Sequence, residues 1–203
     1  MKQFLLEGGG DLVYDPDFIL PNEAKIYLNS LITQVAWEQK SSIIKGVSYK
    51  QPRLVAWYGD PGTTYTYSGS RNDPLNWIPL LLGLKERVER ALNVVFNSVL
   101  ANYYRNGNDS IGSHSDNEKE LGDDPIIASL SFGSTRTFEL KYCDKKKNIP
   151  DIQLELSAGS LLVMRGTTQK FWKHSIPKNL SVKEPRVNLT FRKINLTQLG
   201  ILV

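Results

Sequence analysis

Near its C-terminal end the chain reads Arg186-Val187-Asn188-Leu189-Thr190-Phe191-Arg192. Apolar and polar side chains alternate here with a period of two, which predicts a β-strand whose two faces meet different surroundings. Val187, Leu189 and Phe191 form a face suited to a protein core. The opposite face carries an arginine at each end, with Asn188 and Thr190 between them. This strand predicts a fold rich in β-structure.

The polar face of this strand has two interpretations. One is a surface strand with a solvated face, which is common in antiparallel sheets. The other is a grip for a small dianion, because Arg186 and Arg192 share one face and a planar guanidinium binds carboxylates bidentately. 2-Oxoglutarate is such a dianion: one carboxylate and the keto oxygen chelate a metal, while the other carboxylate needs a fixed cation.

The chain has two histidines, His114 and His174, and Asp116 follows the first of them closely. Residues two apart in an extended segment point the same way, so His114 and Asp116 can reach one metal ion. Two histidines and one carboxylate leave coordination positions open, as in non-heme Fe(II) oxygenases. A His-x-Asp pair also arises by chance and a loop histidine is usually solvated, so the pair alone does not establish a metal site.

The rest of the chain places two helices before a series of strands. A helix is expected to open at Pro21 with Asn22 as its N-cap, and a second helix is expected near Pro79. Their apolar stripes are Leu28, Leu31, Ile32 and Val35, and Leu81, Leu84, Val88, Leu92 and Val95. The candidate strands are Val99–Tyr104, Ile126–Phe132, Thr137–Leu140, Ile152–Leu156, Ser160–Met164 and Arg186–Arg192. This order predicts an α+β domain with an antiparallel sandwich or jelly roll.

Length and composition limit the class of protein. The 203 residues suit one domain, and 40% hydrophobic with 23% charged residues is typical of a globular protein. No apolar run approaches the roughly 20 residues of a membrane span. The single cysteine, Cys143, excludes an internal disulfide, and we expect a soluble intracellular protein. The net charge of +4 permits polyanion binding without establishing it.

His114-x-Asp116, His174 and Arg186-x5-Arg192, in this order, resemble the signature of the AlkB family of Fe(II)/2-oxoglutarate-dependent dioxygenases. The string Arg-Val-Asn-Leu-Thr-Phe-Arg is typical of the branch that repairs alkylated bases, and the resemblance runs from about Leu54 to Ile194. Further matches are Tyr58-Gly59-Asp60, Tyr65-Thr66-Tyr67-Ser68-Gly69, Asn102-Tyr103-Tyr104-Arg105, Ile111-Gly112-Ser113-His114-Ser115-Asp116, Ser129-Leu130-Ser131-Phe132-Gly133 and Ala158-Gly159-Ser160-Leu161-Leu162.

This resemblance implies a fold and a set of cofactor-binding residues. The fold is a double-stranded β-helix, or jelly roll, with N-terminal helices packed on one side and a nucleotide-recognition lid. Residues 1–203 would form a single domain, with the lid at 41–70 and the catalytic core at 97–195. The implied iron ligands are His114, Asp116 and His174. The implied 2-oxoglutarate residues are Arg186 for the distal carboxylate, Arg192 for the end near iron, and Asn102, Tyr104 and Asn188.

The resemblance also implies an activity on nucleic acid. It is the oxidative removal of alkyl groups from bases such as 1-methyladenine and 3-methylcytosine, with dioxygen as second cosubstrate and formaldehyde as product. Such bases are cationic, and an aromatic face with a carboxylate suits them. Tyr67 would stack on the base opposite His114, and Glu118 would accept from its exocyclic amine. Tyr65 would lie near the backbone of the flipped nucleotide.

Several residues have weaker indications of nucleic-acid contact. Arg53, with Lys45 and Lys50, is expected to contact phosphates. Ile43 and Ile44 can wedge into the base stack or belong to the core. The run 145–147 of three lysines is either a solvated loop or a contact with the opposing strand, and Cys143 has no assigned role.

Other functions stay open on the sequence alone. An oxygenase of the same fold can act on RNA, on protein or on a small molecule. A non-catalytic nucleic-acid-binding module and a small cupin-like metal protein are the remaining alternatives, although neither needs the arginine pair together with three metal ligands. We expect a monomer that binds DNA foremost, or RNA, and no membrane. Its compartment would be the cytoplasm in a bacterium and the nucleus in a eukaryote.

Overall fold

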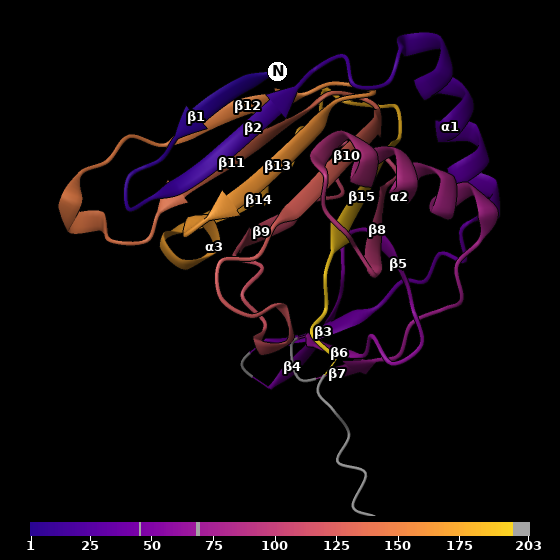
Figure 1. The fold of residues 1–203 in the computed structure, drawn as a ribbon, viewed down its shortest axis with the longest axis horizontal. Coiled ribbons are helices and arrows are strands. Elements are labelled where there is room, and N and C mark those ends of the chain that lie inside the picture. The colour runs from indigo at the N-terminus through magenta and orange to yellow at the C-terminus, as the bar shows by residue number, and fades with distance from the viewer. Residues whose placement is uncertain (45, 68–69, 197–203) are drawn as a thin grey trace, which may run out of the picture.

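Two antiparallel sheets face each other in this protein (Figure 1). The computed structural model describes residues 1–44, 46–67 and 70–196, with only the backbone described at 42–44, 65–67 and 70–72. The larger sheet has the order β1 (Lys2–Leu5), β2 (Gly10–Asp15), β13 (Leu161–Gly166), β10 (Ile127–Gly133), β15 (Arg186–Arg192), β8 (Ser98–Tyr104) and β5 (Leu54–Gly59). The smaller sheet has the order β12 (Ile152–Leu156), β11 (Arg136–Tyr142), β14 (Trp172–Ile176) and β9 (Ile111–His114). The expected α+β fold with two antiparallel sheets is confirmed.

Strand β15, which carries both Arg186 and Arg192, lies in the middle of the larger sheet between β10 and β8. Val187, Leu189 and Phe191 belong to the apolar layer beneath the helices. The polar side chains of β15 are buried as well, since all seven residues of the strand are buried. The interpretation of a solvated surface strand is therefore wrong, and the polar face points into the space between the sheets.

Two helices cover the outer face of the larger sheet, as Figure 1 shows. They are α1 (Pro21–Gln34) and α2 (Pro79–Leu92), and each has a proline in its first turn. The N-cap assigned to Asn22 is wrong: Leu20 is the cap residue, and Asn22 lies inside the helix that Pro21 opens. Leu31, Leu81, Leu84 and Val88 are fully buried, as their spacing predicts.

Helix α2 is shorter than its apolar stripe suggested. It ends at Leu92 because Asn93 adopts the left-handed conformation that closes many helices. Val95 therefore lies outside the helix and is 68% exposed, so its assignment to the buried stripe is wrong.

Shorter elements complete the fold. Two small hairpins, β3 (Ser41–Ile44) with β4 (Val47–Lys50) and β6 (Tyr65–Tyr67) with β7 (Ser70–Asn72), project from the lower end in Figure 1. Helix α3 (Thr168–Phe171) leads directly into β14, and two 3-10 turns are η1 (Lys119–Leu121) and η2 (Lys145–Lys147). None of the helices in the described ranges is long and apolar enough to cross a membrane.

Candidate metal and cosubstrate site

A buried pocket lies between the two sheets. It is a hollow of about 440 Å³, a volume that includes its open mouth. The larger sheet lines it from β8, β10, β13 and β15, and the smaller sheet from β9, β11, β12 and β14. Eight residues that the sequence singled out line this pocket together: Asn102, Tyr104, His114, Asp116, His174, Arg186, Asn188 and Arg192.

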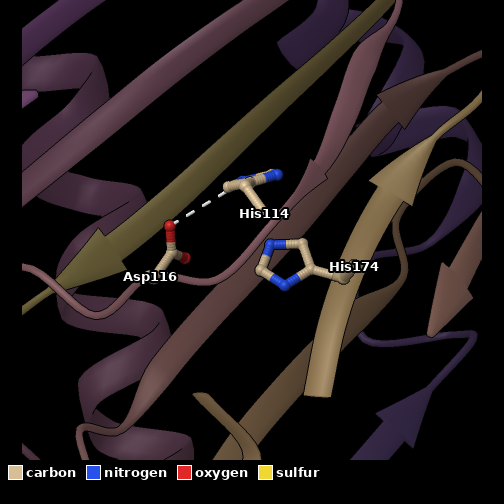
Figure 2. Close-up of side chains that lie close together, drawn as sticks. All are labelled: His114, Asp116 and His174. Carbon is tan, nitrogen blue, oxygen red and sulfur yellow. Dashed lines mark ion pairs between the residues drawn. The ribbon is translucent and has the colours of Figure 1, made fainter. Parts of the chain in front are cut away.

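Three side chains in this pocket can hold a metal ion (Figure 2). His114 ends β9 and lies opposite His174 on β14, while Asp116 follows in the loop after β9. One ligand atom from each of the three lies within 4.8 Å of the others. The two imidazole rings are 4.3 Å apart between centroids, and Nε2 of His114 lies 3.9 Å from Oδ1 of Asp116. Two histidines and one carboxylate are the ligand set of a non-heme iron site.

The protonation states of these groups suit metal binding. Burial lowers the pKa of His114, and burial together with the neighbouring His114 lowers the pKa of His174 to about 3. Burial opposes ionisation of Asp116, but Arg192 and the two histidines outweigh it, so the pKa of Asp116 falls to about 2. Nδ1 of His114 lies 2.9 Å from the carbonyl oxygen of Gly112. As a donor to that oxygen, Nδ1 carries the proton and leaves Nε2 free for a metal.

The two arginines of β15 have different partners. Nη2 of Arg192 donates to Oδ1 of Asp116 at 2.6 Å, so this arginine holds a candidate metal ligand. Arg186 is 1% exposed, and its Nη2 donates to Oγ of Ser131 at 3.0 Å. Within the described residues, Nε and Nη1 of Arg186 have no hydrogen-bond partner. Burial lowers the pKa of Arg186, which means that its charge lacks full compensation.

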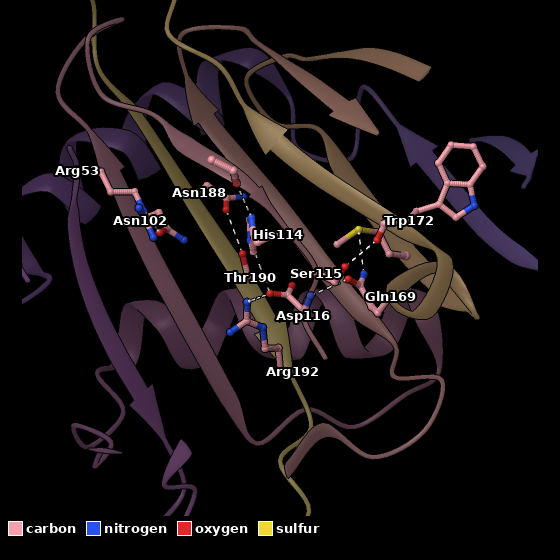
Figure 3. A network of polar contacts seen from close by, with 12 residues as sticks. Arg53, Asn102, His114, Ser115, Asp116, Gln169, Trp172, Asn188, Thr190 and Arg192 are labelled. Atoms are coloured by element: carbon pink, nitrogen blue, oxygen red, sulfur yellow. Dashed lines mark hydrogen bonds and ion pairs between the residues drawn. The ribbon is translucent and has the colours of Figure 1, made fainter. Parts of the chain in front are cut away.

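A polar network surrounds these groups (Figure 3). Nδ2 of Asn188 donates to Oγ of Ser129 at 2.8 Å, and Oγ1 of Thr190 donates to Oδ1 of Asn188 at 3.0 Å. Nε of Arg53 donates to Oδ1 of Asn102 at 2.7 Å, and Arg53 is 5% exposed. The guanidinium of Arg53 is therefore turned toward Asn102, one of the residues that line the pocket. The expected contact of Arg53 with a phosphate stays a prediction.

The ring of Tyr104 packs against two buried guanidinium groups. The Cζ atoms of Arg186 and Arg136 are 5.2 and 5.6 Å from the centre of its ring. Arg136 donates to the carbonyl oxygens of Asp109 and Pro177, at 2.9 and 2.6 Å, and so fixes the loops at this end of the pocket. This part of the pocket is strongly positive and suits an anion.

Comparison with known proteins gives the family. The model described as the 2OG-Fe(II) oxygenase superfamily matches residues 11–192. The human protein named Alpha-ketoglutarate-dependent dioxygenase alkB homolog 3 is 45% identical over 186 residues, which cover 88% of this chain and 64% of that relative. The human DNA oxidative demethylase ALKBH2 is 44% identical over 158 residues, covering 75% of this chain and 60% of that relative. This chain belongs to the AlkB family of 2OG-Fe(II) oxygenases.

The chain spans 64% and 60% of the lengths of these two relatives. The solved structure of OsALKBH1 has a TM-score of 0.63 at 15% identity, and the match covers 95% of this chain and 100% of that one. That likeness concerns the fold.

The residues of the pocket fit the two groups that the superfamily description names, Fe(II) and 2-oxoglutarate. The metal fits because His114, Asp116 and His174 form the expected cluster. The dianion fits because Arg186 is buried in the same pocket with two donor atoms that lack an acceptor among the described residues. The prediction that this chain uses Fe(II) and 2-oxoglutarate is therefore confirmed.

The remaining predicted residues are not among those that line the pocket, and some of them lie outside the described residues. Glu118 is half-buried, and its Oε2 atom is buried without a hydrogen-bond partner in the part of the chain that the structure describes. The side chains of Tyr65, Tyr67, Ile43 and Ile44, and all of Lys45, lie outside the described residues. Lys50 and the three lysines of η2 are exposed, and Nζ of Lys147 pairs with Glu7 at 3.5 Å. The thiol-bearing Cys143 is exposed.

Several residues that organise the pocket had no role assigned to them from the sequence. Ser129 and Ser131 hold Asn188 and Arg186, and their alternation with apolar residues in β10 was a usable signal. Gln169 accepts a hydrogen bond from the backbone of Asp116, and Arg136 fixes two loops. Neither of these last two has a spacing or a motif that points to the pocket.

Proposed function

We propose that this protein is an Fe(II)- and 2-oxoglutarate-dependent dioxygenase that removes alkyl groups from nucleic-acid bases such as 1-methyladenine and 3-methylcytosine. The observation that carries the proposal is one buried pocket that holds both a two-histidine, one-carboxylate cluster and an arginine with unsatisfied donors. The names of the two human relatives, a dioxygenase and a DNA oxidative demethylase, support this substrate class.

Each pocket residue has a defined role in this proposal. His114, Asp116 and His174 hold the iron, and Arg186 binds the distal carboxylate of 2-oxoglutarate. Asn102, Tyr104 and Asn188 orient the cosubstrate from neighbouring strands. Arg192, expected at the end of the cosubstrate near iron, already donates to Oδ1 of Asp116. We assign it the role of keeping that carboxylate ionised and oriented.

When bound here, iron and 2-oxoglutarate would use dioxygen to oxidise the N-methyl group to N-hydroxymethyl. In the same reaction 2-oxoglutarate would become succinate and carbon dioxide. The hydroxymethyl group then leaves as formaldehyde: its hydroxyl releases a proton to solvent, its C–N bond breaks, and the ring nitrogen retains the electron pair of that bond. The protein contributes position and shielding from water. Burial of the pocket between two sheets keeps the reacting groups away from solvent.

Recognition of the base is assigned to groups at the mouth of the pocket. Glu118 has a buried oxygen without a hydrogen-bond partner among the described residues, which suits the exocyclic amine of a cationic base. Tyr67 is proposed to stack on that base and Tyr65 to lie near its nucleotide backbone. Both belong to strand β6, which lies with β3, β4 and β5 in the proposed recognition lid at 41–70.

The wider assignments are proposals of the same kind. Residues 1–203 form a single domain with the catalytic core at 97–195, and the protein acts as a monomer on alkylated DNA foremost. Extrusion of the damaged base costs a few kcal/mol, and a methyl group on the pairing edge lowers that cost. The host decides whether the compartment is cytoplasm or nucleus.

The test is repair of a synthetic oligonucleotide that carries one 3-methylcytosine. Mass spectrometry should show conversion to cytosine with wild-type protein, Fe(II), 2-oxoglutarate and air. Arg186→Ala should lose at least 10-fold in kcat/KM, because the distal carboxylate loses a charge-assisted bond. Lys25→Ala, an exposed lysine on helix α1 outside the pocket, is the control and should retain full activity. Wild-type protein that forms succinate but leaves the base methylated would contradict the proposed substrate.

A further inference from the structure

The backbone at Asp116 needs a hydrogen-bond partner from outside any sheet. Strand β9 ends at His114 and the turn η1 begins at Lys119, so the segment between them has no ladder of its own. Asp116 is 2% exposed. A buried N–H group without an acceptor costs free energy comparable to a lost hydrogen bond. Oε1 of Gln169 is that acceptor, at 2.8 Å from the Asp116 nitrogen.

The orientation of the Gln169 side chain is fixed by its two partners. Gln169 is 3% exposed, and its Nε2 donates to Sδ of Met164 at 3.3 Å. A thioether sulfur can only accept and a backbone N–H can only donate. The amide nitrogen of Gln169 therefore faces Met164, and its oxygen faces Asp116. Figure 3 shows the side chain of Gln169 reaching toward Asp116.

A second bond ties the same loop to the same part of the chain. Oγ of Ser115 donates to the carbonyl oxygen of Trp172 at 2.8 Å. Gln169 lies on helix α3, which runs directly into β14 and so to His174. Ser115 and Asp116 follow each other in the chain, and both are thus anchored to the segment that carries His174. The separation of Asp116 from His174 depends on these anchors.

Asp116 is therefore held at both ends. Nη2 of Arg192 holds its carboxylate at 2.6 Å, and Gln169 holds its backbone. Partners that orient a metal ligand commonly affect metal affinity 10- to 100-fold. We propose that Gln169 is a positioning residue of the metal centre, which fixes the Asp116 carboxylate against the two histidines. This inference rests on the proposed function, since it takes Asp116 as a metal ligand.

The test measures the dissociation constant of Mn(II) for the full chain by calorimetry, without turnover. Gln169→Met keeps the length and burial of the side chain but removes the acceptor. The control is Thr168→Val, because Thr168 is equally buried on the same helix and its hydroxyl bonds Asp11 and Arg165 instead. We expect Gln169→Met to raise the dissociation constant at least 10-fold. Thr168→Val should lower thermal stability and leave the Mn(II) dissociation constant unchanged.

A conservative variant separates the acceptor from general packing. Gln169→Glu keeps an oxygen at the same reach and should bind Mn(II) more like wild type than like Gln169→Met. If Gln169→Met does not fold, Gln169→Asn takes its place, because the shorter side chain cannot span Asp116 and Met164. Unchanged affinity in the acceptor-deficient variant would overturn the inference. Equal weakening by Thr168→Val would overturn it as well, because the whole helix and not Gln169 would then be responsible.

Failure of the inference and failure of the proposed function give different results. If wild-type protein binds one Mn(II) and His174→Ala does not, the metal centre stands. Unchanged binding in Gln169→Met then counts against the positioning role alone. If His174→Ala binds as well as wild type, the metal centre itself is wrong, and the inference fails with it.

Discussion

Glu118 differs from Asp116 in what surrounds its carboxylate. The pKa of Asp116 is lowered to about 2 because Arg192 and two histidines outweigh its burial, whereas burial raises the pKa of Glu118. Oε2 of Glu118 is buried and has no hydrogen-bond partner among the described residues. A carboxylate in this setting gains from any donor that enters the pocket mouth. A cationic base brings both a donor and a positive charge.

Glu118→Gln is therefore expected to lower kcat/KM for repair of 3-methylcytosine by about 10-fold or more, the value of one charge-assisted hydrogen bond. The affinities for Mn(II) and 2-oxoglutarate should not change, because Glu118 is not among the proposed ligands. Steady-state repair kinetics with titration of both ligands checks this. Asp123→Asn, an exposed carboxylate nearby, is the control. An equal loss in both variants would argue against a role for Glu118 in the base pocket.

At this scale the sequence predicted which residues share a face but not which partner each one takes. The period of two in β15 placed Arg186 and Arg192 together, and both are buried between the sheets. Their roles depend on strands distant in the chain: Arg192 meets Asp116, and Arg186 meets Ser131. Spacing along one strand carries no information about the side chains that a second strand brings opposite.

Among the elements, the turn after β10 depends on a glycine. Gly133 has a φ of +87°, and a Cβ atom there would lie 2.3 Å from the carbonyl oxygen of Pro185, just before β15. Gly46, between β3 and β4, has a similar φ of +78° with nothing within 4 Å of that position. An alanine at Gly46 would therefore meet only the strain of the left-handed backbone. An alanine at Gly133 would meet the same strain and a steric clash as well.

Gly46→Ala is expected to cost about 1–2 kcal/mol in the free energy of unfolding, from the left-handed backbone alone. Gly133→Ala should cost more, because its methyl group also displaces the backbone at the start of the strand that holds both arginines. Urea denaturation of the two variants and wild type measures the difference. Equal losses in the free energy of unfolding would contradict this prediction, because the backbone at Pro185 would then move aside without an energetic cost.

Element prediction succeeded where pattern and length agreed and failed where a strand carries polar chemistry. Strand β12 matches the predicted Ile152–Leu156, since its apolar residues alternate cleanly. Strand β14 has lysine, histidine and serine in sequence, so alternation did not reveal it. It exists because it pairs with β11 and β9. The Asn93 C-cap likewise depends on a backbone conformation that the apolar stripe of α2 does not encode.

For the molecule as a whole, the burial of His174 makes the free energy of unfolding depend on pH. The pKa of His174 is about 3 in the folded protein, below the ordinary value of 6.5. Between these pH values the unfolded chain binds a proton that the folded chain does not. Stability of the metal-free protein is therefore lost as the pH falls below 6.5, by at most about 1.4 kcal/mol per pH unit from this group.

Metal-free protein is accordingly expected to lose about 2 kcal/mol in the free energy of unfolding between pH 7 and pH 5 from His174. His174→Gln removes the titrating group and should show a smaller dependence over the same interval. Urea denaturation at both pH values measures the effect. The same slope in both proteins would contradict the assigned environment of His174.

The most direct test of the proposed repair activity counts products in a single experiment. Protein loaded with Fe(II) and 2-oxoglutarate without oxygen is mixed with air and an oligonucleotide that carries 3-methylcytosine. Succinate, formaldehyde and restored cytosine are then measured together. We predict equal amounts of all three, and none in His114→Ala. Succinate without formaldehyde or restored cytosine would contradict the assignment of alkylated bases as the substrate.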